Sequence, residues 1–220
     1  MAIKWNDHSK LEGLHAFLGA SQWHWINWND EIFEKRFASQ YSTTLGTAIH
    51  ELASQCIKSR TKLTMEDKHL IDITLYKAKV PKSTYDAEKI LANLIPFVND
   101  AIGYHMSSEI ILYYSPFCFG TTDAIGYDER TKTLRVHDYK SGSVQAHIEQ
   151  LMIYAALFCL EYHINPKTLK RTELRIYQDI NNQGPTVLEH FPEAQEIEKF
   201  MDIIKRGNEL AMALYERDGK

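Results

Sequence analysis

Cysteine is scarce in this sequence and forms no pattern. The cysteines among 220 residues are Cys56, Cys118 and Cys159, which are widely spaced and contain no CxxC pair. Structural zinc sites and disulfide frameworks rely on closely spaced or even-numbered cysteines, so we expect neither here. We also predict that no iron–sulfur cluster is bound, because such clusters are usually held by four cysteine ligands.

Long apolar runs are missing as well. The amino-terminal Met-Ala-Ile-Lys-Trp-Asn-Asp-His lacks the apolar core of a signal peptide, and no run approaches the length of a membrane span. We therefore expect a cytoplasmic protein that makes no membrane contact. Helicase motifs and the GxxxxGK(S/T) pattern of a phosphate-binding loop are also absent, so we expect a stand-alone module.

The remaining composition is that of an ordinary globular protein, with 44% hydrophobic and 25% charged residues. A chain of this length is most economically a single domain, residues 1–220, which can bury a core without disulfides or metals. The formal net charge of −4 argues against a uniformly basic surface. It does not exclude a local basic groove, because affinity for phosphates depends on where the cations lie.

The most informative stretch of the chain runs from Phe119 to Gly142 and is typical of a β-hairpin. Residues 121–127 and 133–139 are rich in β-branched and aromatic side chains. A polar turn, residues 128–132, separates them. Two short runs of this kind on either side of a turn predict two paired strands.

The second strand of this hairpin ends in Asp138-Tyr139-Lys140. Side chains alternate along a strand, so Asp138 and Lys140 project to one side and Tyr139 to the other. A carboxylate and an ammonium at a strand's end can hold a divalent cation and stabilise a developing negative charge. Asp123, on the neighbouring strand, can complete the metal site. This combination indicates phosphodiester hydrolysis.

The same residues carry a family resemblance. Gly120-Thr-Thr-Asp123, followed by Asp138-Tyr-Lys140-Ser-Gly142, resembles the metal-binding and catalytic motifs of the PD-(D/E)XK nucleases. Gly46-Thr-Ala-Ile-His50 upstream and Gln150-Leu-Met-Ile-Tyr154 downstream are similar to motifs of the branch that includes the RecB nuclease domain and the CRISPR-adaptation nucleases. Asp-x-Lys alone occurs often by chance, whereas four motifs in order are specific. The resemblance covers roughly residues 40–180.

The resemblance implies an α/β fold with a restriction-endonuclease-like core, in which helices flank a mixed central sheet. It implies that Mg²⁺ or Mn²⁺ is held by His50, Asp123, Asp138 and the backbone carbonyl of Tyr139. Asp123, Asp138 and Lys140 are then the catalytic residues. A histidine beside an apolar helical stripe, as His50 is, would otherwise be interpreted as a surface or core residue.

Two further residues gain a role from the resemblance. Gln150 and Tyr154 share one helix face. Taken alone they would be interpreted as a surface amide and a core ring, but in the resembled branch such residues contact DNA or organise the site. Glu109 lies at the start of the strand expected at residues 107–115. It is interpreted as a group that supports the metal ligands and is not itself a ligand.

The parts of the domain around this core are expected as follows. The core comprises roughly residues 40–60 and 106–180, preceded by an aromatic-rich arm, residues 1–40. The tryptophans of that arm either stack on DNA bases or attach the arm to the body; they are Trp5, Trp23, Trp25 and Trp28. Residues 60–105 form a helical insertion and residues 193–217 an amphipathic carboxyl-terminal helix. The helices and strands are expected at about 45–59, 65–78, 83–105, 107–115, 144–162, 170–179 and 186–191.

Lysine is concentrated in residues 58–89, with few acids to balance it. Lys77 and Lys79 are candidate contacts to a DNA backbone beside the site. The alternative interpretation is a solvated helical face.

These observations predict a metal-dependent DNA nuclease. An exonuclease that processes DNA ends in recombination or repair, as in bacteriophage systems within an infected or bacterial cell, is the first expectation. An endonuclease acting on branched or single-stranded DNA is the alternative, and a non-catalytic module that binds DNA or protein is an alternative of another class. DNA is the expected partner, with a recombination, annealing or single-strand-binding protein as a possible second. Oligomeric state, polarity and strand preference stay open.

Overall fold

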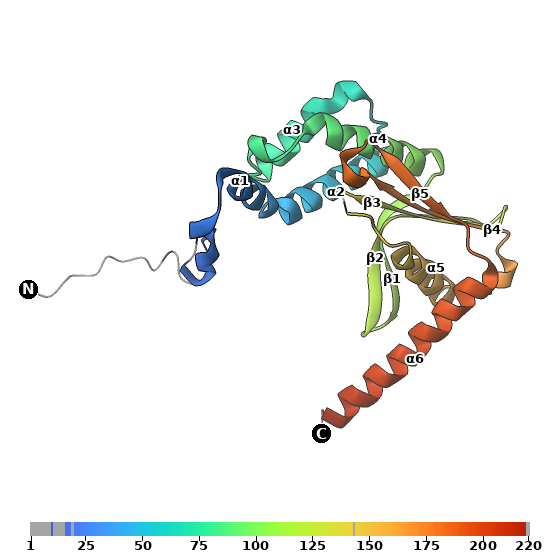
Figure 1. Cartoon of the computed structure of the whole chain (residues 1–220). Helices are drawn as coiled ribbons and strands as arrows, with labels where there is room; N and C mark the ends of the chain where they lie inside the picture. Colours follow the sequence, from blue (N-terminus) through green and yellow to red (C-terminus); the bar gives the residue numbers. More distant parts are fainter. Residues whose placement is uncertain (1–9, 11–15, 19, 143, 219–220) are drawn as a thin grey trace, which may run out of the picture.

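A five-stranded mixed sheet lies at the centre of the fold (Figure 1). The computed structural model describes residues 10, 16–18, 20–142 and 144–218. The strands follow the order of the chain across the sheet. They are β1 (Ser107–Ser115), β2 (Cys118–Asp128), β3 (Thr133–Lys140), β4 (Arg171–Gln178) and β5 (Thr186–His190). Only β3 and β4 are parallel; the other neighbouring pairs are antiparallel. The chain crosses between the parallel strands through α5 (Glu149–Glu161), as parallel pairing requires.

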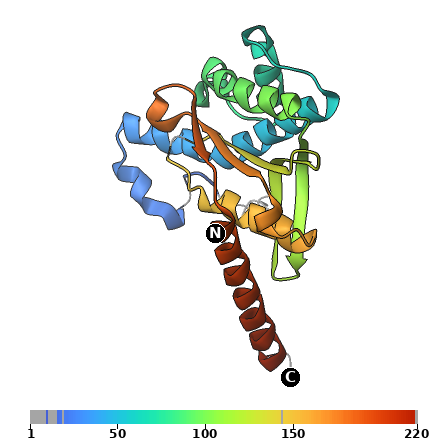
Figure 2. The same ribbon diagram turned by 90° about the vertical axis from the view of Figure 1, so that its right-hand side faces the viewer.

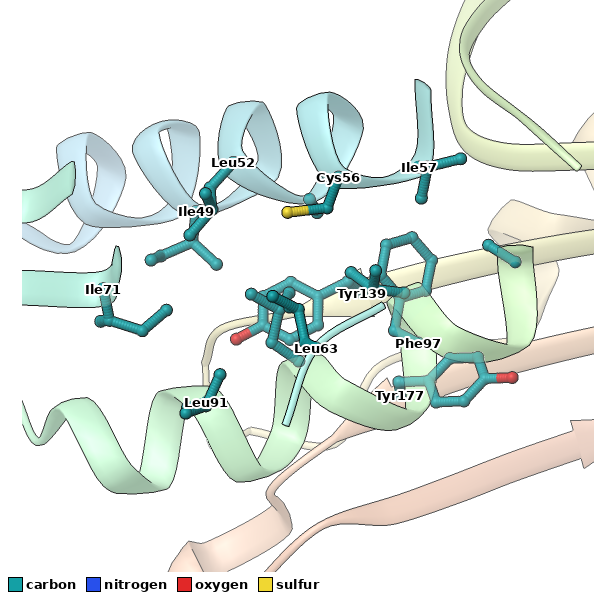
Figure 3. Close-up of a cluster of buried hydrophobic side chains, with 14 of the residues drawn as sticks. Ile49, Leu52, Cys56, Ile57, Leu63, Ile71, Leu91, Phe97, Tyr139 and Tyr177 are labelled. Carbon is teal, nitrogen blue, oxygen red and sulfur yellow. The ribbon is translucent and has the colours of Figure 1, made fainter. Parts of the chain in front are cut away.

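Helices cover both faces of this sheet (Figures 1 and 2). On one face, α2 (Ser42–Ser59), α3 (Lys68–Lys77) and α4 (Ala87–Gly103) pack around Tyr139 and Tyr177. Figure 3 shows the Tyr139 ring between α2 and α4 and the Tyr177 ring beside α4. On the other face, α5 packs against Leu134, Val136 and their β4 neighbours, and α6 (Ala194–Asp218) packs on α5. The expected α/β class, a mixed sheet flanked by helices, is confirmed.

The helix that carries His50 has clear local causes. Apolar residues of α2 recur at helical spacing, and Ile49, Ala53 and Ile57 are buried against the sheet. The helix ends at Arg60, whose left-handed backbone (φ 58°) lets Thr61 N–H donate to the Cys56 carbonyl at 3.0 Å. The expected helix over about 45–59 is therefore confirmed, and it begins one turn earlier than expected.

Two other helices begin later than the sequence pattern predicts. The helix expected from residue 83 begins at Ala87, where the Asp86 carboxylate accepts hydrogen bonds from Glu88 N–H and Lys89 N–H. The helix expected from residue 144 begins at Glu149. The side chain of the buried Gln178 explains the second delay. It bonds Gly142 O, Val144 O and Ala146 N–H, which holds this loop out of helical geometry.

The segments outside the core differ in how they contact it. α4, from the expected insertion, packs directly on the sheet: Leu91, Leu94 and Phe97 are almost fully buried. The arm includes a 3-10 helix (Ala20–Asn27) and α1 (Asp30–Ser39), which buries no residue. Its rings contact one another, as in Phe17 against Trp28. Trp5 lies outside the described residues.

The remaining elements agree with the sequence expectations within a few residues. β1 matches its expected range, and β5 pairs only with β4 at the sheet edge, as expected. α6 matches the expected carboxyl-terminal helix. Among the described residues, no helix has both the length and the apolar character needed to cross a membrane.

Candidate metal centre

α2 and the β1–β2 hairpin bring three potential metal ligands together. His50, in the middle of α2, places Nδ1 3.2 Å from Oδ1 of Asp123 on β2. Glu109 on β1 joins them, since one ligand atom from each of His50, Glu109 and Asp123 lies within 4.8 Å of the others. An imidazole nitrogen and two carboxylates are donors that fit Mn²⁺ or Mg²⁺. The described residues therefore offer a donor set that fits the expected cations.

The backbone at Glu109 is unusual for a strand. Its φ is 55°, a left-handed conformation that costs a non-glycine residue on the order of 1 kcal/mol or more. The β1–β2 pairing is regular on both sides of it, with Ser108 opposite Ala124 and Ile110 opposite Thr122. The surrounding pairs thus hold Glu109 in this conformation across from Asp123. Sequence reasoning excluded Glu109 as a ligand. The available signal was an acid directly before the apolar run of residues 110–114 in the same strand.

Asp123 is fixed by its second oxygen. Oδ2 accepts a hydrogen bond from Tyr139 N–H at 2.8 Å, which ties β2 to β3 at the site. The Tyr139 ring is buried in the core under α2 and meets the His50 ring edge-on, with centroids 5.6 Å apart. One residue therefore orients both the carboxylate and the imidazole. The alternation expected for Asp138, Tyr139 and Lys140 is confirmed.

Lys140 is held by a chain of polar contacts on the α5 side of the sheet. Its Nζ lies 3.2 Å from Asp138 Oδ1 and 2.9 Å from Gln150 Oε1. Gln150 Nε2 lies 3.5 Å from the Tyr154 hydroxyl, which donates to the Thr121 carbonyl at 2.7 Å. The chain runs from β3 through α5 back to β2, so Gln150 and Tyr154 connect the lysine to the strand that carries Asp123.

Close packing supports the same region. A side chain at Gly120 would place its Cβ 2.9 Å from Tyr154 Cε1, so glycine lets α5 approach β2. At Gly46 a Cβ would meet Ser141 Oγ at 3.3 Å, where α2 passes the end of β3. The Lys140 carbonyl also accepts a hydrogen bond from Asn93 of α4 at 3.2 Å. The glycines of two motifs thus lie at close contacts beside the site.

The acidic groups repel one another in this arrangement. Burial and the charge of Asp123 raise the pKa of Asp138 to about 6, against the opposing effect of Lys140. Burial and Asp123 also raise the pKa of Glu109. Burial lowers the pKa of His50, but the hydrogen bond to Asp123 and the nearby carboxylates outweigh that effect and raise it. A bound divalent cation would offset this repulsion.

Asp138 has a carboxylate oxygen that could also coordinate a cation. Lys140 Nζ lies 3.0 Å from its Oδ2, but the approach is poorly aligned, and this buried oxygen has no hydrogen-bond partner among the described residues. A buried carboxylate oxygen without a partner is unusual and costly. The poorly aligned lysine contact at Oδ2 is an ion pair and not a hydrogen bond. The lone pairs of this oxygen are therefore available to a cation.

The ligand cluster opens into a cavity of about 750 Å³. One wall is α2, including Lys58 from its last turn; Thr121 and Ser141 line the opposite side with the ligands. Lys77 lines a separate hollow on the other side of α2, which shares Glu51 and Gln55 with the cavity. Lys79 is exposed just beyond α3. Neither of the two predicted DNA-contacting lysines therefore lines the cavity that holds the cluster.

Comparisons with known proteins identified no relative of this chain. The chain matches no protein-family model, and comparisons with curated proteins and with solved structures likewise found no match. The fold and the site by themselves define a mixed α/β protein with a histidine–carboxylate cluster beside an ion-paired lysine.

Proposed function

We propose that this protein is a Mg²⁺- or Mn²⁺-dependent deoxyribonuclease built on a PD-(D/E)XK core. The observation that carries the proposal is the convergence of His50, Asp123 and Glu109 beside the Asp138–Lys140 pair. These residues come from four separate elements, and each except Glu109 belongs to a motif of the resembled family. A random Asp-x-Lys sequence has no reason to lie next to an imidazole and two further carboxylates.

The protein residues divide the work as follows. His50, Asp123 and Glu109 hold the cation, with the Asp138 oxygen and the Tyr139 carbonyl as further candidate ligands. The bound cation supplies positive charge that polarises a phosphodiester and lowers the pKa of a water molecule. Lys140 presents its ammonium to the negative charge that develops on the phosphate. Asp138 and Gln150 hold that ammonium in place from two sides.

DNA ends are the proposed substrate. Lys58 lines the cavity and Lys77 lines the separate hollow beyond α2, so both can provide cations for phosphates. An exonuclease acting in recombination or repair is the first choice, because the compact size of this module resembles the exonucleases of such systems. The intact Asp138–Lys140 pair argues against the alternative of a non-catalytic binding module, because a module that only grips DNA has no need of this costly buried carboxylate.

The test is cleavage of labelled linear and closed circular DNA with Mg²⁺, Mn²⁺ or EDTA. Metal-dependent loss of linear DNA alone supports an exonuclease, and cleavage of circles supports an endonuclease. Asp123→Asn and Glu109→Gln should each abolish the metal-dependent activity, whereas Lys199→Ala, on exposed α6, should not change it. Wild-type protein that binds DNA but cleaves none with either metal would refute the proposal and favour the binding module.

A further inference from the structure

The β1–β2 hairpin continues past the candidate metal centre with an exposed apolar face. Tyr113 is paired with Phe119 and Ile111 with Thr121. Side chains two residues apart share a face. Tyr113 and Ile111 therefore follow Glu109 along β1, while Phe119 and Thr121 lie on the side of Asp123. Thr121 lines the same cavity as Glu109 and Asp123, which agrees with this placement. We call Ile111, Tyr113, Phe119 and Thr121 the hairpin face.

The hairpin face is open, and its rings are arranged for stacking. Ile111, Tyr113 and Phe119 are 60%, 47% and 61% exposed. The rings of Tyr113 and Phe119 are stacked, with centroids 6.3 Å apart and planes at 28°. The opposite side of the hairpin is covered, because α5 packs there against Leu112 and against Gly120 through Tyr154. Figures 1 and 2 show the hairpin extending beyond the sheet. The rings thus sit on a supported strand pair and not on a loose loop.

The charge of this hairpin identifies what it can bind. Residues 107–128 contain no lysine or arginine, whereas Glu109, Asp123 and Asp128 are acidic. Binding to DNA phosphates depends on cations in a duplex and in a single strand alike, so this surface is unsuited to direct phosphate contacts. Aromatic faces instead bind unpaired bases, whose rings stack on them regardless of sequence. Duplex DNA hides its bases from such a contact.

We propose that Tyr113 and Phe119 form a stacking platform for the unpaired bases of a DNA strand whose scissile phosphate lies at the candidate metal centre. The inference rests on the proposed nuclease function and assigns it a single-stranded substrate region. Phe119 is four residues from Asp123, or about 13 Å along a strand. Stacked nucleotides are spaced at about 3.4 Å, so a strand lying along the hairpin reaches the rings within about four nucleotides.

The test compares a normal and an abasic oligonucleotide. Fluorescence anisotropy in EDTA measures the affinity of the protein for labelled oligo(dT) and for an abasic strand of equal length and charge. Phe119→Leu keeps an apolar side chain but removes the ring. We expect it to weaken oligo(dT) binding about 5- to 140-fold, the value of one lost base stack, and to leave the abasic strand unchanged. Phe119→Tyr, which keeps a ring, should bind like wild type.

Matched controls separate stacking from other roles. Tyr76 is 82% exposed and lies on α3, outside the β1–β2 hairpin. Tyr76→Leu should therefore change the affinity for neither strand. Equal losses for both strands, or no loss, in Phe119→Leu would overturn the platform. A wild-type dimer that dissociates on this substitution, seen by light scattering, would overturn it in favour of contact with a second copy.

The proposed function and the platform can fail separately. Metal-dependent cleavage without ring-dependent binding rejects the platform alone. Ring-dependent oligo(dT) binding without any cleavage supports the platform and rejects the nuclease. A wild-type protein that neither cleaves nor binds DNA rejects both.

Discussion

Gly120 offers a prediction in which the sign of a stability change follows from one contact. Alanine at this position would place its Cβ 2.9 Å from Tyr154 Cε1, which is closer than real side chains approach. The ring cannot swing away freely, since its hydroxyl donates to the Thr121 carbonyl at 2.7 Å. Gly120→Ala should therefore displace the Tyr154 ring and break that hydrogen bond.

The expected magnitude combines three effects. Overpacking costs about 1–3 kcal/mol. The lost hydrogen bond costs about 0.5–1.5 kcal/mol. Replacing glycine restricts the unfolded chain, which returns about 0.4–1 kcal/mol. The net expectation for Gly120→Ala is a loss of about 0.5–4 kcal/mol in the free energy of unfolding, measured by urea denaturation with an unchanged m-value.

Gly207 provides the matched control. It lies within α6, where an added Cβ meets nothing within 4 Å. Gly207→Ala should therefore stabilise the protein by about 0.5–1 kcal/mol, the usual advantage of alanine in a helix. The same chemical change thus has opposite signs at two positions.

A double-mutant cycle tests the cause. Tyr154→Phe alone should cost about 0.5–1.5 kcal/mol, whereas in the Gly120→Ala background it should cost almost nothing because the bond is already broken. A Gly120→Ala protein as stable as wild type, or additive effects in the cycle, would refute the reasoning.

Four further predictions concern the site and its surroundings. Lys140→Ala should lower the cleavage rate about 10²–10³-fold with the fold preserved, as judged by circular dichroism. Saturating Mn²⁺ should raise the melting temperature of wild type but not of Asp123→Asn, because a ligand of the native state stabilises it. Lys77→Ala and Lys79→Ala should each reduce the salt slope of DNA binding by about one. Burial, with Arg175 and Arg135 nearby, lowers the pKa of His137 to about 3. Between about pH 6.5 and pH 3 only the unfolded chain binds this proton. The stability contributed by the neutral His137 is therefore complete above about pH 6.5 and is lost as the pH falls towards 3. His137→Gln should flatten the decline in the free energy of unfolding between about pH 7 and about pH 5.

Each of these four has an outcome that contradicts it. Undiminished cleavage by Lys140→Ala removes the lysine from the chemistry. Equal Mn²⁺ stabilisation of wild type and Asp123→Asn places the ion elsewhere. An unchanged salt slope in both lysine variants means that α3 presents only a solvated face. A His137→Gln protein with the wild-type pH dependence shows that the imidazole is protonated without cost.

Local patterns predicted the elements well where covalent geometry alone decides them. The period of two along β3 predicts that Asp138 and Lys140 share a side opposite Tyr139, because successive strand residues point to opposite faces. The helical period likewise places His50 at the edge of the apolar stripe of α2. Boundaries were less predictable: the loop before α5 is held by Gln178, a contact from β4 that no local pattern contains.

The candidate site likewise has features that local sequence predicts and features that depend on tertiary packing. The sequence alone picks out four candidate site residues, because each is identified by a motif of neighbouring residues. They are His50, Asp123, Asp138 and Lys140. The position of Glu109 beside His50 and Asp123 depends on its left-handed backbone, on the β1–β2 register and on the docking of α2 over Tyr139. Distances between distant residues are set by how the whole core packs, and only the tertiary structure decides them.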